Sequence, residues 1–99
     1  MEESVMIEIS EKMYEEIAAL LLAEIGDKDY FNGTVEYDTE EFYSSLTCSL
    51  IVCREPESLG ILSILPVWWD YDIALCDGVQ LNDFSWLELD RYLAKKIKG

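Results

Sequence analysis

The sequence predicts an α+β fold in which two helices pack on one face of an antiparallel sheet of three to four strands. Apolar residues near both ends of the chain recur at three- and four-residue steps, which is typical of amphipathic helices. The middle of the chain alternates apolar and polar residues in runs bounded by turn residues, which is typical of strands. A length of 99 residues and a hydrophobic content of 51% indicate one domain, residues 1–99, with a core of its own.

The first helix is predicted over residues 10–26. Ser10 can cap its N-terminus, and Gly26 stands where a left-handed backbone often ends a helix. The run SVMIEIS before it favours either an extra N-terminal strand or an earlier helix start. The apolar face of the helix contains Met13, Tyr14, Ile17, Ala18, Leu20, Leu21, Leu22 and Ile25.

Three strands are expected to follow. A loop, DKDYFNG, leads to a short strand, TVEY, and then to a turn, DTEE. The second strand spans residues 42–54, and the third spans residues 61–76 with Pro66 marking an edge position or a bulge. The inner side of the second strand carries Phe42, Leu46, Cys48, Leu50 and Val52. Its outer side carries the small or polar residues Tyr43, Ser45, Thr47 and Ser49.

Local sequence signals predict the start of the second helix. Asp77 and Gly78 predict a turn, after which the stretch VQLND can pair briefly with the third strand. Ser85 and Glu88 have the spacing of a capping box, in which each side chain bonds the other's backbone. The apolar stripe of this helix is formed by Trp86, Leu89, Leu93 and Ile97, and its last turns carry Lys95, Lys96 and Lys98. The resulting αβββα order is also that of double-stranded RNA-binding domains, as an analogy of fold alone.

The charge limits the kinds of partner. The net charge is −14, and only Lys12, Lys28 and Arg54 oppose the 21 acids found up to Asp90. Such a surface repels phosphate backbones and anionic lipids, so we expect no direct nucleic-acid binding and no membrane binding. The start of the chain lacks the basic segment of a secretory signal, and the longest apolar run, residues 17–23, is too short to span a membrane. We therefore expect a cytoplasmic protein.

The sequence predicts no catalytic residue, no metal site and no cofactor. It contains no histidine and no glycine-rich phosphate loop, and its Ser and Cys residues have no evident activating partner. Cys48, Cys53 and Cys76 lack metal-type spacing, and we expect reduced, buried thiols. Two acidic patterns resemble cation ligands, the pair Asp70 and Asp72 and the calcium-loop-like residues 27–38, but solvated acids explain both. We therefore expect a protein that is not an enzyme.

The two adjacent tryptophans are the main candidates for function. Neighbouring side chains of a strand point to opposite faces. Within residues 67–76, Val67, Trp69, Tyr71, Ile73 and Leu75 share the side expected to face the helices. Trp68 then lies on the face left open. The predicted interaction site consists of Trp68, Tyr43, Thr47, Asp70 and Asp72, an aromatic anchor with polar surroundings. The alternative is that Trp68 merely covers its cross-strand neighbours.

We therefore expect a non-enzymatic protein-interaction module that uses its open sheet face. Its partner would be an unidentified protein, either a basic one or a second copy of the chain. The alternative is a nucleic-acid mimic, or an inhibitor of a basic nucleic-acid-binding protein, in which carboxylates take the place of phosphates.

A resemblance bears on this choice. The run from Ile9 to Val52, followed by PVWWDYD and LNDFSWLELDRYL, resembles small uncharacterised proteins of gut Bacteroidales, some of them carried on phages or conjugative elements. The likeness covers most of the chain. It implies a cytoplasmic bacterial protein and assigns no catalytic residue. A mobile-element setting would favour the mimic, acting against host defence.

Overall fold

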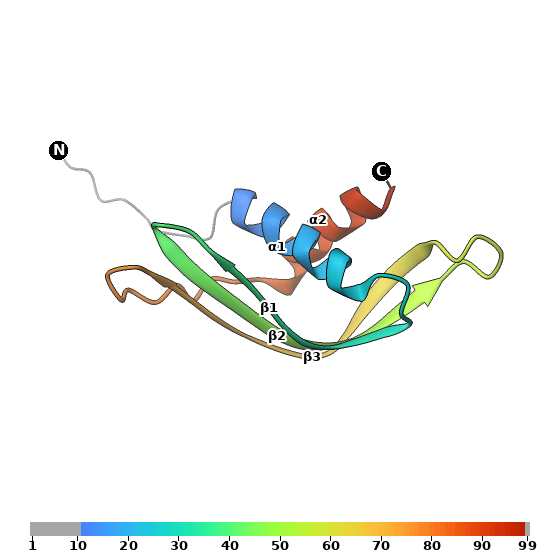
Figure 1. Ribbon diagram of the computed structural model, residues 1–99, viewed down its shortest axis with the longest axis horizontal. Coiled ribbons are helices and arrows are strands. Elements are labelled where there is room, and N and C mark those ends of the chain that lie inside the picture. Colours follow the sequence, from blue (N-terminus) through green and yellow to red (C-terminus); the bar gives the residue numbers. More distant parts are fainter. Residues whose placement is uncertain (1–10, 99) are drawn as a thin grey trace.

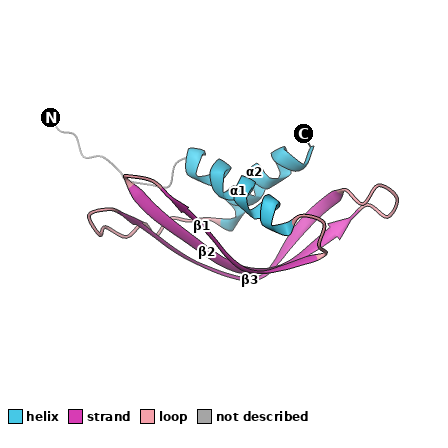
Figure 2. Ribbon diagram, viewed as in Figure 1, coloured by secondary structure: helices cyan, strands magenta, loops and turns pink. Residues whose placement is uncertain are grey.

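The computed structural model describes residues 11–98 and confirms the α+β fold. The elements are α1 (Glu11–Ile25), β1 (Tyr30–Asp38), β2 (Phe42–Arg54), β3 (Ile61–Leu75) and α2 (Trp86–Lys98). The strands form an open antiparallel sheet in the order β1-β2-β3. Both helices lie on the concave side of the bent sheet (Figures 1 and 2). The predicted extra strand and the Ser10 cap lie outside the described residues.

The helices close a single core against the sheet. α1 packs on β1, and α2 contacts both α1 and β3. Ser44 is buried among these apolar groups, and its hydroxyl donates a 2.8 Å hydrogen bond to the carbonyl of Tyr37. The most deeply buried apolar side chains are Ile17, Leu21, Ile25, Leu46, Cys48, Leu50, Ile73, Leu89 and Leu93. Because the core lies on one side of the sheet only, the other side has no cover from either helix.

The first strand is longer than predicted. The expected loop DKDYFNG is wrong in its second half, because β1 already begins at Tyr30, which is paired with Ile51 of β2. Gly33, the last residue of that expected loop, lies within β1. A side chain there would come within 3.3 Å of the Phe31 ring, so glycine leaves room for that ring to lie along the inner face. The calcium-loop pattern of residues 27–38 is also excluded, because most of it is an extended strand.

The pairing of β3 with β2 shifts at two places, and the shift beside Trp68 decides which side chains face outward. Ser49 is paired with Trp68 and Leu50 with Pro66, so Val67 is an extra residue in β3 and forms the predicted bulge. Trp69 faces the helices as expected, with its ring centroid 5.5 Å from that of Phe84. The inward placement of Val67 was wrong. As the bulged residue it is 65% exposed.

The signals for the second helix are confirmed except for one half of the capping box, because the Glu88 carboxylate accepts from Arg91 and not from the backbone N–H of Ser85. Gly78 adopts a positive φ of 97° in the predicted turn, and Gln80 forms a bridge with Ala74 of β3. The Ser85 hydroxyl accepts a 3.3 Å hydrogen bond from the backbone N–H of Glu88, as an N-cap does. The backbone N–H of Ser85 donates in turn to the Tyr14 hydroxyl at 3.0 Å. This bond ties the start of α2 to α1.

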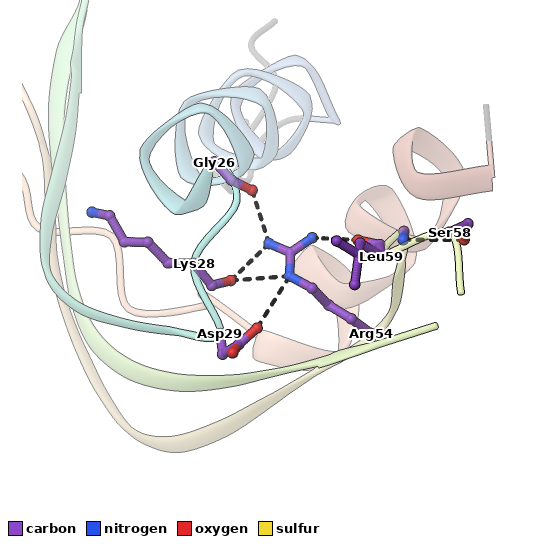
Figure 3. A network of polar contacts seen from close by, with 7 residues as sticks. Gly26, Lys28, Asp29, Arg54, Ser58 and Leu59 are labelled. Atoms are coloured by element: carbon purple, nitrogen blue, oxygen red, sulfur yellow. Dashed lines mark hydrogen bonds and ion pairs between the residues drawn. The ribbon is translucent and has the colours of Figure 1, made fainter. Parts of the chain in front are cut away.

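A single guanidinium joins the end of α1 to the β2–β3 loop (Figure 3). Arg54 donates to the carbonyls of Gly26 at 2.9 Å, Lys28 at 2.7 Å and Leu59 at 2.9 Å. Its Nε also lies 3.4 Å from a carboxylate oxygen of Asp29. The Arg54 side chain is only 13% exposed. Since α1 has no basic residue in its last turn, Arg54 supplies the positive charge that a helix C-terminus favours.

The two tryptophans should differ in their effect on stability. We expect Trp69→Ala to lower the free energy of unfolding by about 3 kcal/mol, because it removes a ring packed against Phe84 and Trp86. Trp68→Ala should lower it by less than about 1 kcal/mol. Urea denaturation followed by far-ultraviolet circular dichroism measures both. A larger loss from Trp68→Ala would contradict the orientation of β3.

Removing the Arg54 guanidinium should be costly. We expect Arg54→Met to lower the free energy of unfolding by about 3 kcal/mol, because the three carbonyls lose a charged donor. Arg54→Lys should recover only part of the loss, since an ammonium cannot reproduce the planar fork of donors. Asp29→Asn is the matched control. Its carboxylate is 83% exposed, so the change should stay within about 0.5 kcal/mol. If Arg54→Met and Asp29→Asn lowered the free energy of unfolding equally, the ion pair and not the carbonyl contacts would be the stabilising interaction.

Candidate functional site

The outward positions of the three strands form a regular grid, here called the open face. Each row crosses the sheet from β1 through β2 to β3, as the pairing registers define. The first three rows are Tyr30–Ile51–Leu65, Asn32–Ser49–Trp68 and Thr34–Thr47–Asp70. The last two are Glu36–Ser45–Asp72 and Asp38–Tyr43–Ala74. The chemistry therefore changes along the strands from apolar to acidic.

One end of the open face, here called the apolar half, is an exposed hydrophobic band. It consists of Tyr30, Ile51, Leu65, Val67 and Trp68. Trp68 is 53% exposed and Tyr30 is 65% exposed, and the three aliphatic residues are exposed as well. Single exposed apolar residues are ordinary on proteins, whereas these five adjoin across three strands, which makes them the candidate interaction site.

The other end, here called the acidic half, carries Glu36, Asp38, Asp70 and Asp72. None of the four forms an ion pair with a basic residue among positions 11–98. Their mutual repulsion and their attraction for cations are therefore not neutralised by neighbouring side chains. The Tyr43 hydroxyl donates a 2.7 Å hydrogen bond to Asp72, and this bond to the carboxylate raises the pKa of Tyr43.

Polar bonds across the strands order the middle of the face. Thr34 and Thr47 share a 2.8 Å hydroxyl contact, and the Ser49 hydroxyl donates to the side-chain oxygen of Asn32 at 3.0 Å. Such cross-strand pairs hold neighbouring strands in register. The apolar and acidic halves are therefore parts of one ordered surface.

All five predicted site residues lie on the open face. Tyr43 and Asp72 are in direct contact, and Thr47 is the pairing partner of Asp70. Trp68 belongs to the apolar half, one row from Asp70. Whether these residues bind a partner stays a prediction.

Sequence reasoning missed Tyr30, Ile51 and Leu65. Ile51 shares the alternation of Tyr43 and Ser49, so extending the outer face of β2 by one step would have found it. Leu65 could be placed only with the bulge at Val67, which reverses the alternation upstream. Tyr30 could be assigned to the outer face only if β1 was known to begin there.

The open face is shallow. The hollow in its acidic half is lined by Ser45, Thr47, Asp70, Tyr71 and Asp72 and measures about 70 Å³, whereas small-molecule pockets have hundreds. A hollow of about 320 Å³ borders the face along β1, where Glu24 and Lys28 line it together with Tyr30, Asn32 and Thr34. A hollow of about 320 Å³ lies between α2 and β3, on the other side of the sheet, with Ile61, Ile64, Ala94 and Ile97 among its lining residues. Among residues 11–98, no three Cys, Asp or Glu side chains are grouped so as to hold a metal ion. The shape of the open face suits contact with another macromolecular surface.

The cysteines differ in their environments. Cys48 is buried, Cys53 is half-buried and Cys76 is exposed, and all three are free thiols. The expectation of buried thiols was thus wrong for Cys76, which lies just beyond the end of β3, where its Sγ contacts the carbonyl of Glu40 at 2.9 Å. Burial raises the pKa of the Cys48 thiol to about 11. Cys48 therefore acts as a small apolar group of the core at neutral pH.

Comparisons with protein-family models, curated proteins and solved structures gave no match. The resemblance to Bacteroidales proteins therefore stays a prediction. Neither helix in the described part of the chain has the length and apolar character needed to cross a membrane.

Stability should fall in alkaline solution, in part through Cys48. Its ordinary pKa of 9.0 is raised to about 11 in the folded protein. Between these values the unfolded chain loses the thiol proton while the folded chain keeps it, so unfolding becomes easier as pH rises. We expect Cys48 to account for roughly 2 kcal/mol lost between pH 9 and 11. Urea denaturation at several pH values measures the slope, and Cys48→Ala is the control that should make it shallower. If Cys48→Ala left the pH dependence of the free energy of unfolding unchanged, Cys48 would not be the group responsible.

Proposed function

We propose that this protein is a non-enzymatic, cytoplasmic interaction module that binds a protein partner through its open face. The observation that carries the proposal is the apolar half, a contiguous hydrophobic band on the side of the sheet that neither helix covers. Water contact with such a band is unfavourable by about 25 cal/mol per Å². A partner that covers the band would release that free energy.

Trp68 is the best candidate for the centre of the contact. Tryptophan and tyrosine dominate binding energy at many interfaces, because each buries a large area with few rotatable bonds. Trp68 has Ser49 opposite it and Leu65 on the same strand, so its ring stands beside small and aliphatic neighbours. Those neighbours would exclude water around the ring once a partner is bound.

The acidic half would select the partner. Four carboxylates without basic neighbours attract a surface rich in Lys and Arg and repel an acidic one. We therefore propose a partner whose contact surface is apolar at one end and basic at the other. The basic end would mainly speed association, while the apolar end would slow dissociation.

A nucleic-acid mimic is the second candidate, and the unpaired carboxylates of the acidic half favour it. Asp70 and Asp72 project from the same face of β3, and Glu36 and Asp38 project from the same face of β1. Two such rows of negative charge could enter a groove built for phosphates. This candidate gives the acids, not Trp68, the main part in binding.

A binding experiment separates the two candidates. The tagged protein and its variants are incubated with host extract, retained proteins are identified, and the purified partner is titrated by calorimetry. We expect Trp68→Ala to weaken binding at least tenfold, as for a central interface residue. Leu87→Ala is the matched control. Leu87 is 78% exposed on α2, away from the open face, and its loss should change nothing.

The double variant Asp70→Asn/Asp72→Asn decides the role of the acids. For the interaction module it should weaken binding less than Trp68→Ala does. For the mimic it should dominate, and DNA or RNA should compete with this protein for the partner. If Trp68→Ala and Leu87→Ala bind alike and the acid variant also binds normally, the open face is not the binding surface.

A further inference from the structure

We propose that, without another partner, two copies of the chain cover each other's apolar halves and form a face-to-face dimer. This inference rests on the proposed function, because it names an occupant for the same surface. It concerns only the apolar half. The acidic half of each copy would remain free.

The position of the apolar half makes it self-complementary. The band crosses all three strands near one end of β1, with Tyr30, Ile51 and Leu65 in one row. A two-fold axis parallel to that row, between it and the row of Trp68 and midway between two stacked sheets, places each band on the other. The same rotation reverses the strand direction, so the two acidic halves extend away in opposite directions. A symmetric dimer of this kind uses one patch on both copies.

The available area is that of a weak dimer. Aromatic side chains carry 150–250 Å², so Trp68 and Tyr30 at their observed exposures offer roughly 100 Å² or more each. Ile51, Leu65 and Val67 add aliphatic surface, and Asn32 and Ser49 lie in the adjoining row. Together these groups stay below the about 800 Å² per partner of a standard interface, which is the size range of weak, transient contacts.

Charge does not prevent this contact. Ile51 and Ser45 are six residues apart on β2, about 20 Å for an extended strand. The acidic rows of the two copies would be separated by more than that, because they diverge from the axis. The Debye length is about 8 Å at physiological ionic strength, so their repulsion is largely screened there. The convex shape of the open face (Figure 1) also carries the ends of the sheets apart.

Pairing of sheet edges is the less favourable way to dimerise. β3 is an edge strand, but Pro66 has no N–H to donate, and the bulge at Val67 interrupts its regular ladder. A second β3 could therefore form only short segments of hydrogen bonds along this edge. Face-to-face contact needs no free backbone groups and covers the exposed side chains directly.

Sedimentation equilibrium of the full chain, from micromolar to millimolar concentration, tests the proposal. We expect a monomer–dimer equilibrium in which Trp68→Ala raises the dissociation constant about tenfold or more. Ile51→Ser should act in the same direction, and Leu87→Ala should have no effect. Far-ultraviolet circular dichroism confirms that each variant is folded. Raising the salt concentration from 20 to 300 mM should tighten the dimer severalfold, because it screens like charges.

Three results would overturn the dimer. The chain could remain monomeric at every concentration, or Trp68→Ala could leave dimerisation unchanged. Dissociation on adding salt would instead indicate contact between the C-terminal lysines of one copy and acids of another. None of these outcomes decides the proposed function, which depends on the binding of a different protein. The binding titration with Leu87→Ala as control can fail independently of the dimer.

Discussion

The pleat of the sheet, together with helices on one side only, is the constraint on which the rest of the molecule depends. Alternate side chains of each strand must face either the core or water, because residues 11–98 place no second layer on the far side of the sheet. This division puts Trp69 against Phe84 and Trp86 and leaves Trp68 exposed. It also collects the acids of β1 and β3 on one surface. The candidate site therefore follows from the same alternation that builds the core.

The chain has few basic residues, and one of them, Arg54, has a structural role. Arg54 lies at the end of β2 and bonds carbonyls from the turn after α1 and from the β2–β3 loop. Because it is nearly buried, its charge contributes little to the outer field of the protein. Of the remaining cations, Arg91, Lys95, Lys96 and Lys98 lie on α2, Lys12 lies in α1 and Lys28 lies just after it. Among residues 11–98 none of them pairs with Glu36, Asp38, Asp70 or Asp72, and the proposed basic partner rests on that uncompensated charge.

Features that depend on neighbouring residues were predicted well from the sequence. Features that depend on pairing between distant strands were not. Ser85 and Gly78 act through contacts a few residues away, so their roles could be inferred from the sequence alone. The start of β1 at Tyr30 depends on a long β2 that pairs with it, and the local turn preference of Gly33 concealed it. The five predicted site residues were found by alternation. Tyr30 and Leu65 were missed because their faces depend on pairing and on the bulge.

The bulge at Val67 reverses which alternate side chains of β3 face the core. Immediately upstream of it Ile64 faces the core, and downstream odd-numbered residues such as Trp69 do. One strand thereby supplies apolar groups to both sides in succession. The loss of a single residue within β3 would exchange interior and exterior along part of the strand, so the number of residues in β3 constrains the fold as well as their chemistry.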